Sequence, residues 1–465
     1  MTVKWMVLKF GGSSVSGRKQ WDAIESLAKN RLNQGYRVLL VCSALKGVTN
    51  ALQELADNAD FYEFTMVAKI ISRHRQLGIQ LGIDLEDLLT QAEKQMTSNV
   101  ERIAEANTDA RRYAGIASLL AIGEWLSTHI GERYLAQKLV IEWVDATEAL
   151  QAVVEDKAHV RRTWLAARCN SGVDPALQSR WLMKPQLLIT QGFVAAHPQG
   201  GVVLLGRGGS DTSAVLLASL LEAVHVEIWT DVRGLYSADP RIIPSARLLR
   251  SLNYDEALEM AASGAKVLHA RSIRVAANAR LQVRVGHLGH GNSTGTTIED
   301  RKEALAQRKK GIRCVCYQPQ MAVLLLQNLD MREQVGFLSW VFSKISEAGI
   351  SIDLVATSET TTTIAINMIS NHLDELILSD LADKLRYRCS VTVFPRCSAI
   401  NLVGFGARVA LAKIDPDSAF FSKHPLLMLS QSANDLSISL LVHESHAHEL
   451  LKTLHNSLIL DNAAG

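Results

Sequence analysis

Residues 3–14 read VKWMVLKFGGSS, an apolar stretch that runs directly into two glycines and two serines. Beyond this stretch, apolar residues recur at the spacing of a helix, at positions 21, 24, 27, 28 and 32. The pattern predicts a strand, a glycine turn and a helix. Glycines at such a turn let backbone amides face an anion, and the following helix adds the positive end of its dipole. Lys9 brings a further positive charge to the same place.

The same alternation continues through the first 300 residues. A second apolar run, Val38–Ala44, lies between Gly35 and Gly47. Strands alternating with helices are typical of α/β folds, in which helices cover both faces of a largely parallel sheet. Further strands are expected at 187–190, 202–205, 226–229 and 281–285, and helices at 212–223, 254–262 and 267–279, with 61–112 mostly helical.

The pattern changes beyond residues 301–310, where charged residues replace the apolar period and indicate a linker. The order of elements that follows, βαββαβ, is that of a split ferredoxin-like unit. A weaker second copy ends the chain, and its first helix is interrupted at Pro416. The first copy has strands at 322–327, 352–356, 362–367 and 391–394 and helices at 337–348 and 373–385; the second has strands at 400–403, 426–429 and 436–441 and a helix over 449–454.

Composition excludes several classes of protein. The 465 residues are 48% hydrophobic and 21% charged, which excludes disordered, collagen-like and coiled-coil chains. A net charge of +2 gives no global field that would gather nucleic acid or a membrane surface. The six cysteines form no Cys-x-x-Cys pair, which favours a reducing compartment. We therefore expect a cytoplasmic protein with two or three folded units and neither nucleic acid nor membrane as a partner.

A second glycine-rich segment, residues 204–212, reads LLGRGGSDT and again joins an expected strand to an expected helix. Three glycines around one arginine predict that the backbone approaches a ligand closely. Arg207 suits a carboxylate or a phosphate, since its guanidinium forms paired hydrogen bonds with such groups. Asp211 has two open interpretations, as the N-cap of the helix or as the residue that orients Lys9.

Other polar motifs are weaker taken alone. Neither a Walker A loop nor a Gly-x-Gly-x-x-Gly fingerprint occurs. Asp231 is placed to accept a hydrogen bond from a ribose or a base, and Tyr236 to stack on it. Lys266 is expected to open a helix, and His269 is interpreted as a packed or capped core histidine and not as a catalyst. The histidines at 443, 446 and 448 lack the zincin spacing, so no metal site is assigned.

Together these motifs resemble the aspartokinase signatures, in order and over nearly the whole chain. The C-terminal pair of units resembles tandem ACT domains. The resemblance implies an amino acid kinase domain at 1–300, a linker at 301–311 and ACT domains at 312–396 and 397–465. The matching motifs are Lys9–Val15, Ser43–Ala44 with Gly47–Asn50, Gly123–Ser127, Thr190–Phe193, Gly206–Asp211, Thr230–Val232 with Asp239–Arg241, and Gly264–His269.

The resemblance implies transfer of the ATP γ-phosphoryl group to the β-carboxylate of L-aspartate, which gives 4-phospho-L-aspartate, the first intermediate towards lysine, threonine and methionine. This carboxylate is ionised at neutral pH, so the attack needs no general base. Asp211 would hold Lys9 in place, and Mg²⁺ would bridge phosphate oxygens. The aspartate pocket would consist of Glu124 on the α-ammonium and Arg207 on the α-carboxylate, with Ser43, Thr49 and Ser210. The ATP site would consist of Lys9, Gly11, Gly12, Thr230, Asp231, Tyr236, Arg241, Lys266 and Val267.

The ACT pair is expected to be regulatory, because its motifs resemble the effector site of the lysine-sensitive class. Asp353 would bind the effector's α-ammonium and amides near Phe337 its carboxylate. L-lysine is the expected effector and threonine stays open, since Gln334 departs from the usual small polar residue. ACT pairing implies at least a homodimer. The effector residues would be Met331, Gln334, Gly336, Phe337, Leu338, Ser351, Ile352, Asp353, Thr357 and Ser358.

Three alternatives remain open at this point. In the first, the chain would be a catalytically silent amino-acid sensor. In the second, it would be a related amino acid kinase that acts on another carboxylate. Intact Lys9, Glu124, Arg207 and Asp211 argue against the silent sensor. Segments 21–24 and 41–45 also resemble the kinase half of fusions with diaminopimelate decarboxylase, in which this chain would be one domain of a longer polypeptide.

Overall fold

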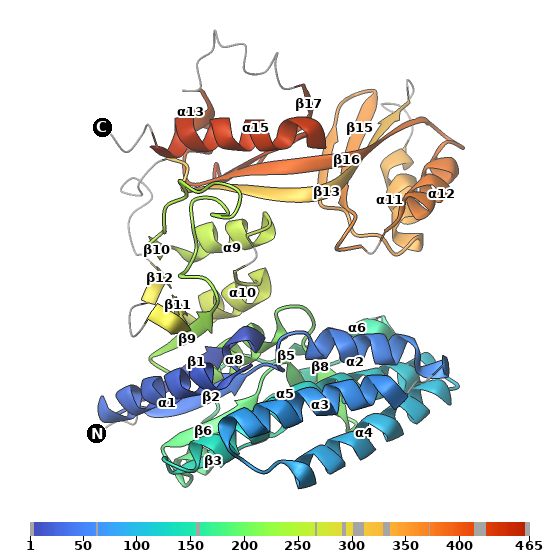
Figure 1. The fold of residues 1–465 in the computed structure, drawn as a ribbon. Coiled ribbons are helices and arrows are strands. Elements are labelled where there is room, and N and C mark those ends of the chain that lie inside the picture. The colour runs from blue at the N-terminus through green and yellow to red at the C-terminus, as the bar shows by residue number, and fades with distance from the viewer. Residues whose placement is uncertain are drawn as a thin grey trace. The chain divides into compact units, whose positions relative to one another are not determined.

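The computed structural model describes most of the chain, in two compact units (Figure 1). The first unit consists of Met1–Leu235, Arg250–Leu258 and Val267–Arg301, and the second of Tyr236–Leu249, Glu259–Lys266 and Lys302–Gly465. The described residues are 4–61, 64–154, 159–265, 267–290, 294–300, 311–328, 335–371, 373–412 and 425–460.

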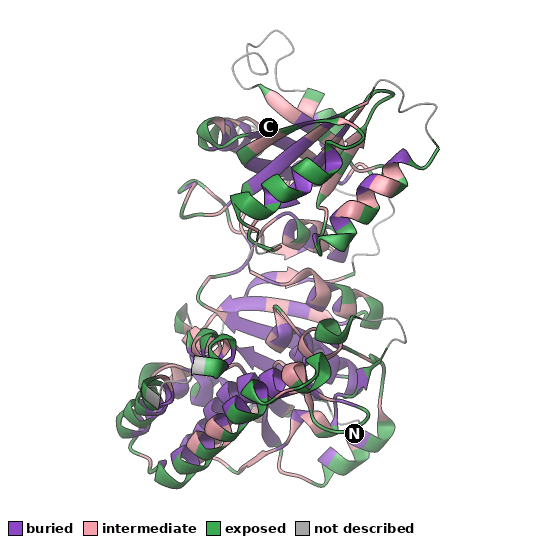
Figure 2. Cartoon of the chain, turned by 90° about the vertical axis from the view of Figure 1, so that its right-hand side faces the viewer, coloured by how far each residue is buried: buried purple, intermediate pink, exposed green. Residues whose placement is uncertain are grey.

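The first unit is built on an eight-stranded sheet in the order β10-β12-β11-β9-β1-β2-β6-β3. All neighbouring pairs are parallel except β11 with β12, so the predicted largely parallel sheet is confirmed. The central strands are buried on both faces (Figure 2), as parallel sheets covered by helices require. The strands are β1 (Trp5–Phe10), β2 (Arg37–Cys42), β3 (Ile141–Trp143), β6 (Leu187–Gln191), β9 (His225–Thr230), β10 (Ser251–Leu252), β11 (Gln282–His287) and β12 (Thr294–Ile298).

Helices cover this sheet on both faces. The long helix α5 (Asp109–Leu135) packs closely on α1 (Arg18–Asn33), because a Cβ on Gly131 would lie 2.1 Å from the Trp21 ring. Alternate β1 residues, Met6, Leu8 and Phe10, join the same core as these helices. The remaining helices are α2 (Val48–Asp57), α3 (Phe64–Leu81), α4 (Glu86–Ala104), α6 (Val160–Leu165), α7 (Pro175–Leu182), α8 (Gly209–Leu220), α9 (Tyr254–Ala262) and α10 (Ala270–Ala279), with small ribbons β4 (Ala152–Val153) with β5 (Arg168–Cys169) and β7 (Val194–Ala196) with β8 (Val202–Leu204).

Three local predictions need correction. The strand expected at 202–205 is β8, which pairs with β7 in a separate ribbon and not in the main sheet. The helix expected from residue 267 begins at Ala270, because the His269 side chain accepts a hydrogen bond from the Arg271 amide and caps the helix. The helix expected from residue 212 begins at Gly209, since Gly208 in a left-handed conformation is its N-cap.

The second unit carries a six-stranded antiparallel sheet in the order β14-β15-β13-β16-β18-β17. The predicted βαββαβ order of the first ferredoxin-like copy is found, with helices between the expected strands. Its elements are β13 (Cys314–Gln327), α11 (Phe337–Glu347), β14 (Leu354–Thr357), β15 (Thr361–Asn367), α12 (Glu375–Leu385) and β16 (Ser390–Val403); α13 (Ala407–Ala412), β17 (Leu426–Gln431), β18 (Ser437–His443) and α15 (Glu444–His455) follow.

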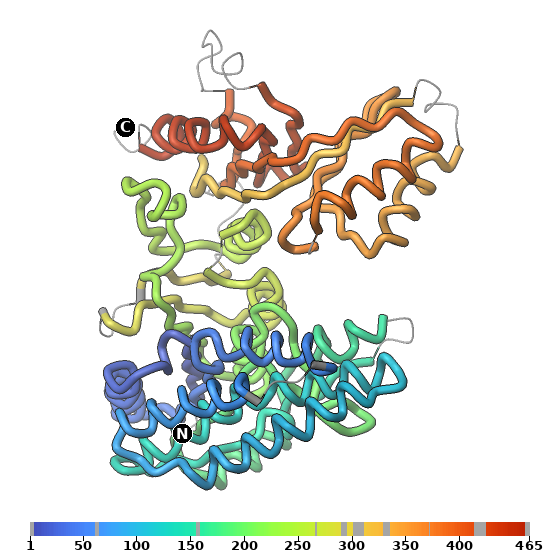
Figure 3. Tube along the Cα trace, turned by 45° about the vertical axis from the view of Figure 1, so that its right-hand side comes forward, coloured from blue at the N-terminus to red at the C-terminus, as the bar shows by residue number. Residues whose placement is uncertain are grey.

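The two copies share their longest strands, which the sequence did not indicate. β13 and β16 run side by side for most of their length (Figure 3), so that 314–318 pairs with 399–403 and 323–327 with 390–394. The ladder is irregular between these segments, where Gln320 and Arg396 adopt φ of 57° and 60°. A cluster containing Met321, Ala365 and Met428 joins the two halves of the sheet.

Two segments that precede residue 300 pack within the second unit. The Cys314 thiol contacts the carbonyl of Tyr236 at 3.3 Å, and Asn401 donates to the carbonyl of Ser263 at 3.3 Å. The expected linker at 301–310 lies outside the described residues, and the domain boundaries stay predictions. Within the described part of the chain, no helix is long and apolar enough to cross a membrane.

Candidate active site

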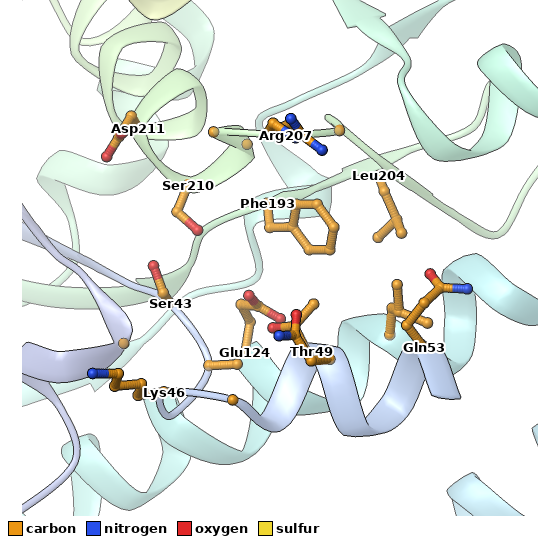
Figure 4. Close-up of a pocket in the computed structure, with 18 of the residues that line it drawn as sticks. Ser43, Lys46, Thr49, Gln53, Glu124, Phe193, Leu204, Arg207, Ser210 and Asp211 are labelled. Carbon is orange, nitrogen blue, oxygen red and sulfur yellow. The ribbon is translucent and has the colours of Figure 1, made fainter. Parts of the chain in front are cut away.

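A cleft of about 630 Å³ opens in the first unit where β1, β2 and β8 end and helix α8 begins (Figure 4). Polar side chains from several predicted motifs share this cleft, although they lie up to 222 residues apart in the sequence. The predicted site residues that line it are Lys9, Gly12, Ser43, Thr49, Glu124, Arg207, Ser210, Asp211 and Asp231.

Lys9 and Asp211 form an ion pair at the end of β1. The Lys9 Nζ lies 2.6 Å from Asp211 Oδ1, and the two side chains are only 10% and 12% exposed. Asp211 stands in the first turn of α8, after its N-cap Gly208. The interpretation of Asp211 as the N-cap of the helix is wrong, because Gly208 is the N-cap. The Asp211 carboxylate instead pairs with the Lys9 ammonium, as the second interpretation expects.

The glycine turn after β1 differs in detail from its prediction. The Gly11 amide donates to the carbonyl of Trp229 at 3.3 Å, so it is engaged by β9. Gly12 lies against the β2–α2 loop, since a Cβ on it would stand 2.6 Å from the carbonyl oxygen of Ala44. Gly12 therefore allows two backbone segments to meet, and the anion contact proposed for this turn rests on Lys9 and the Gly12 amide.

Glu124 lies on α5 and is 3% exposed within the cleft. Burial raises the pKa of Glu124 to about 8, and the backbone amide of Ala44 and the charge of Lys9 only partly oppose this effect. Its Oε2 has no hydrogen-bond partner among the described residues. A buried carboxyl group without a cationic partner is a receptor for a positively charged ligand group, because such a partner restores the favourable ionised state.

The Arg207 loop is shaped by protein packing. Gly206 and Gly208 have φ of 75° and 67°, and Cβ atoms there would meet Ala166 at 3.2 Å and His269 at 2.3 Å. We predicted that this backbone approaches a ligand closely. At Gly206 and Gly208 it instead approaches other segments of the protein, at Ala166 and His269. The Arg271 guanidinium holds the same loop, donating to the carbonyl of Leu205 at 2.8 Å. These contacts present Arg207 at the cleft (Figure 4).

Ser127 and Phe193 were not among the predicted site residues, although they stand inside recognised motifs. Ser127 donates to the carbonyl of Ser43 at 2.6 Å and so fixes the loop that carries Ser43. Phe193 lines the cleft with φ of 71°, and its amide donates to the Ser213 hydroxyl at 2.9 Å. The signal for both was the motif itself, since Ser127 ends the motif that contains Glu124 and Phe193 ends the motif that begins at Thr190.

The predicted ATP residues are divided between the two units. Thr230 donates to Asp231 at 3.1 Å, and both belong to the first unit with Val267. Tyr236 and Arg241 belong to the second unit, where Arg241 pairs with Asp239 at 2.6 Å. Lys266 lies outside the described residues, so its predicted role stays a prediction.

The predicted effector residues flank helix α11 of the second unit. Gly336 is the N-cap of α11 with φ of 87°, and Phe337 is buried behind it, next to Leu338. Asp353 lies after the other end of the helix, where its Oδ2 accepts from the Asn367 amide at 2.7 Å and burial raises its pKa. Met331 and Gln334 lie outside the described residues; Ser351 and Ile352 precede Asp353, and Thr357 and Ser358 end β14.

Residues 4–287 match the amino acid kinase family, over the sheet and the cleft just described. This chain belongs to the amino acid kinase family. Among members of this family, the lysine-sensitive aspartokinase 3 of Escherichia coli is 29% identical over 97% of this chain and 99% of its own length. The aspartate kinase of Pseudomonas fluorescens is 26% identical over 99% and 98% of the two chains.

Solved structures of amino acid kinases agree with this membership. Escherichia coli aspartokinase III in complex with aspartate and ADP, in its R-state, matches 98% of this chain and 100% of its own, with a TM-score of 0.79 and 26% identity. The same enzyme with lysine and aspartate, in its T-state, has a TM-score of 0.76. These comparisons confirm the resemblance to aspartokinases and the predicted fold class.

Proposed function

We propose that this chain is an ATP-dependent aspartate kinase that produces 4-phospho-L-aspartate. One observation carries the proposal. The cleft places the buried Lys9–Asp211 pair beside the glycine turn and, in the same space, the buried carboxyl group of Glu124 and the guanidinium of Arg207. A substrate with one ammonium group and two carboxylates satisfies the last two groups and leaves one carboxylate free to react.

The residues divide the charges of aspartate between them. Glu124 receives the α-ammonium, which restores its ionised state, and Arg207 receives the α-carboxylate through paired hydrogen bonds. Ser43, Thr49 and Ser210 line the space between them. The β-carboxylate is then the nucleophile without loss of a proton, because it is ionised at neutral pH.

The remaining barrier is the approach of two anions. A β-carboxylate oxygen attacks the γ-phosphorus as the bond to ADP breaks, and negative charge spreads over the transferring group. Lys9 offsets this charge, and Asp211 holds its ammonium in one orientation. Thr230, Asp231, Tyr236, Arg241, Lys266 and Val267 remain our proposal for the rest of the ATP site.

Magnesium enters this scheme with the substrate. The described residues contain no group of three or more His, Cys, Asp or Glu side chains that would hold a metal ion. Phosphate oxygens of ATP suit Mg²⁺, which keeps several water ligands and needs few from the protein. We therefore propose the Mg²⁺–ATP complex as the phosphoryl donor.

We also propose that L-lysine inhibits the enzyme through the second unit. The related Escherichia coli enzyme is lysine-sensitive and was solved with lysine. In this chain, Gly336 and Asp353 flank helix α11, whose 11 residues span about 16 Å. We propose that the two groups serve one effector where two copies of the chain pair through these units. The homodimer therefore remains part of the proposal.

The proposed function is tested by following ADP release with a panel of acceptors. Aspartate with Mg²⁺–ATP should give turnover that glutamate, carbamate and water do not give. Equal turnover with glutamate would identify a different amino acid kinase, and no turnover with any acceptor would identify a silent sensor. Repeating the assay with lysine, threonine and methionine, separately and in pairs, identifies the effector. Light scattering with and without lysine tests the dimer.

A further inference from the structure

The loop from Ser43 to Gly47 rests directly on the glycine turn after β1. The Lys46 amide lies 3.2 Å from both the Gly12 carbonyl oxygen and the Ser16 hydroxyl. A Cβ on Gly12 would stand 3.0 Å from the Lys46 nitrogen and 3.2 Å from its Cα. The backbone of Lys46 is therefore fixed against the turn proposed to receive the phosphates, and helix α2 begins two residues later.

Lys46 differs from Lys9 in its charge environment. The ammonium of Lys9 is paired with the carboxylate of Asp211 at 2.6 Å. Lys46 lines the same cleft with an exposed side chain, and within the described residues it forms no ion pair. Its positive charge is therefore available to an anionic ligand, whereas the charge of Lys9 is already balanced.

Lys46 and Arg207 lie on opposite sides of Glu124 in the cleft (Figure 4). In the view of Figure 4, Arg207 lies above Phe193 and Leu204, whereas Lys46 lies below Ser43, on the side away from Gln53. The two cations therefore suit different ligand groups. Arg207 suits the α-carboxylate of the acceptor, and Lys46 suits an anion held over the glycine turn.

We propose that Lys46 is a second catalytic cation, which contacts the γ-phosphoryl group of ATP during transfer. This inference rests on the proposed kinase function and adds a residue to it. As a β-carboxylate oxygen bonds to the γ-phosphorus and the bond to the ADP oxygen breaks, no proton moves and the equatorial oxygens keep their negative charge. Asp211 already balances the charge of Lys9, so Lys9 alone leaves part of the negative charge on the transferring phosphoryl group uncompensated. Lys46 offsets this remaining charge.

The test compares Lys46→Ala, Lys46→Arg and a control, Lys94→Ala, which removes an exposed lysine on α4. We expect Lys46→Ala to lower kcat about 10- to 100-fold with the KM for aspartate within about twofold. Lys46→Arg should recover most of the loss, since it keeps the charge, and Lys94→Ala should match the wild type.

Nucleotide binding provides a readout that is independent of turnover. Lys46→Ala should weaken a non-hydrolysable ATP analogue about tenfold and leave ADP within about twofold, because only the analogue carries a γ-phosphate. Equal weakening of both nucleotides, or unchanged binding with unchanged kcat, overturns the proposal. A raised aspartate KM alone would instead make Lys46 an acceptor ligand. If the wild type does not phosphorylate aspartate, the proposed function fails, but the nucleotide comparison still judges Lys46.

Discussion

The hydroxyl of Ser127 on α5 donates a 2.6 Å hydrogen bond to the backbone carbonyl of Ser43 on the β2–α2 loop. Ser127 is fully buried and also lies 3.2 Å from the carbonyl of Glu124. One side chain thus ties the helix that carries Glu124 to the loop that carries Ser43. The distance between these two proposed aspartate ligands depends on this bond.

Replacing Ser127 should loosen the aspartate pocket. We expect Ser127→Ala to raise the KM for aspartate severalfold with a smaller change in the KM for ATP, and to cost about 1 kcal/mol of unfolding free energy. Steady-state kinetics and thermal unfolding measure both effects. Ser179→Ala, which removes an exposed hydroxyl bonded within α7, is the control. An unchanged aspartate KM would show that the bond does not position the pocket.

Glu124 should make the protein less stable as the pH rises. The folded-state pKa is about 8, above the ordinary value of 4.5, because the carboxyl group is buried. Between these values the unfolded chain releases the proton while the folded chain keeps it, so the unfolding free energy falls with rising pH and levels off above about 8. Glu124→Gln should lack this decline. Relative to the wild type, the unfolding free energy of Glu124→Gln should therefore rise by at most a few kcal/mol between pH 5 and pH 8. Denaturant titrations of both proteins at the two pH values measure this difference.

The same carboxyl group should couple aspartate binding to proton release. The ammonium of aspartate favours the ionised form of Glu124, so the KM for aspartate should fall as the pH rises from 6 towards the pKa of about 8. Calorimetry in buffers of different ionisation enthalpy should detect proton release near pH 7. An aspartate KM independent of pH, with no proton release, would show that Glu124 does not meet the ammonium.

The two glycines after β1 should differ sharply. A Cβ on Gly12 would lie 2.6 Å from a backbone oxygen, whereas a Cβ on Gly11 would lie 3.6 Å from Lys9 Nζ and 4.0 Å from the Trp229 carbonyl oxygen. Gly12→Ala should therefore lower the melting temperature by several degrees, as a 1–3 kcal/mol overpacking cost implies. Gly11→Ala should melt within about 2 °C of the wild type. Similar losses in both variants would contradict the packing described for Gly12.

Asp353 should separate regulation from catalysis. Asp353→Asn keeps the acceptor for the Asn367 amide but removes the charge proposed to meet the effector's ammonium. We expect lysine inhibition to weaken at least tenfold, with kcat within about twofold of the wild type, because a charged hydrogen bond is lost. Lysine titrations of both proteins measure this. Unchanged inhibition would place the effector elsewhere.

Much of the fold could be predicted because its signals are local. The apolar run 3–10 and the glycines after it predict β1 and its turn, and the 3.6-residue spacing predicts α1. The pairing of β13 with β16, the strands that the two ferredoxin-like copies share, could not be predicted. Nothing in the pattern at 314–318 shows that it pairs with 399–403, because pairing between distant strands depends on tertiary register.

The candidate site shows the same limit. Charge and residue type were sufficient to select Lys9, Arg207 and Asp211, and the resemblance to aspartokinases added Glu124. These four residues do share one cleft. Local patterns could not show that the Gly11 amide is engaged by Trp229, or that Gly208 faces His269. They also could not show that Lys46 rests on Gly12, because these contacts join segments far apart in the chain.

The most direct test measures aspartyl hydroxamate formed from aspartate, Mg²⁺–ATP and hydroxylamine, by the wild type and by Lys9→Ala. Hydroxylamine traps the acyl phosphate, so the product reports transfer to a carboxylate and not simple ATP hydrolysis. The wild type should form hydroxamate, and Lys9→Ala should lose at least about 100-fold of this activity, because it removes the ammonium that Asp211 holds in place to offset the transferring charge. Normal hydroxamate formation by Lys9→Ala, or none by the wild type, would contradict the account.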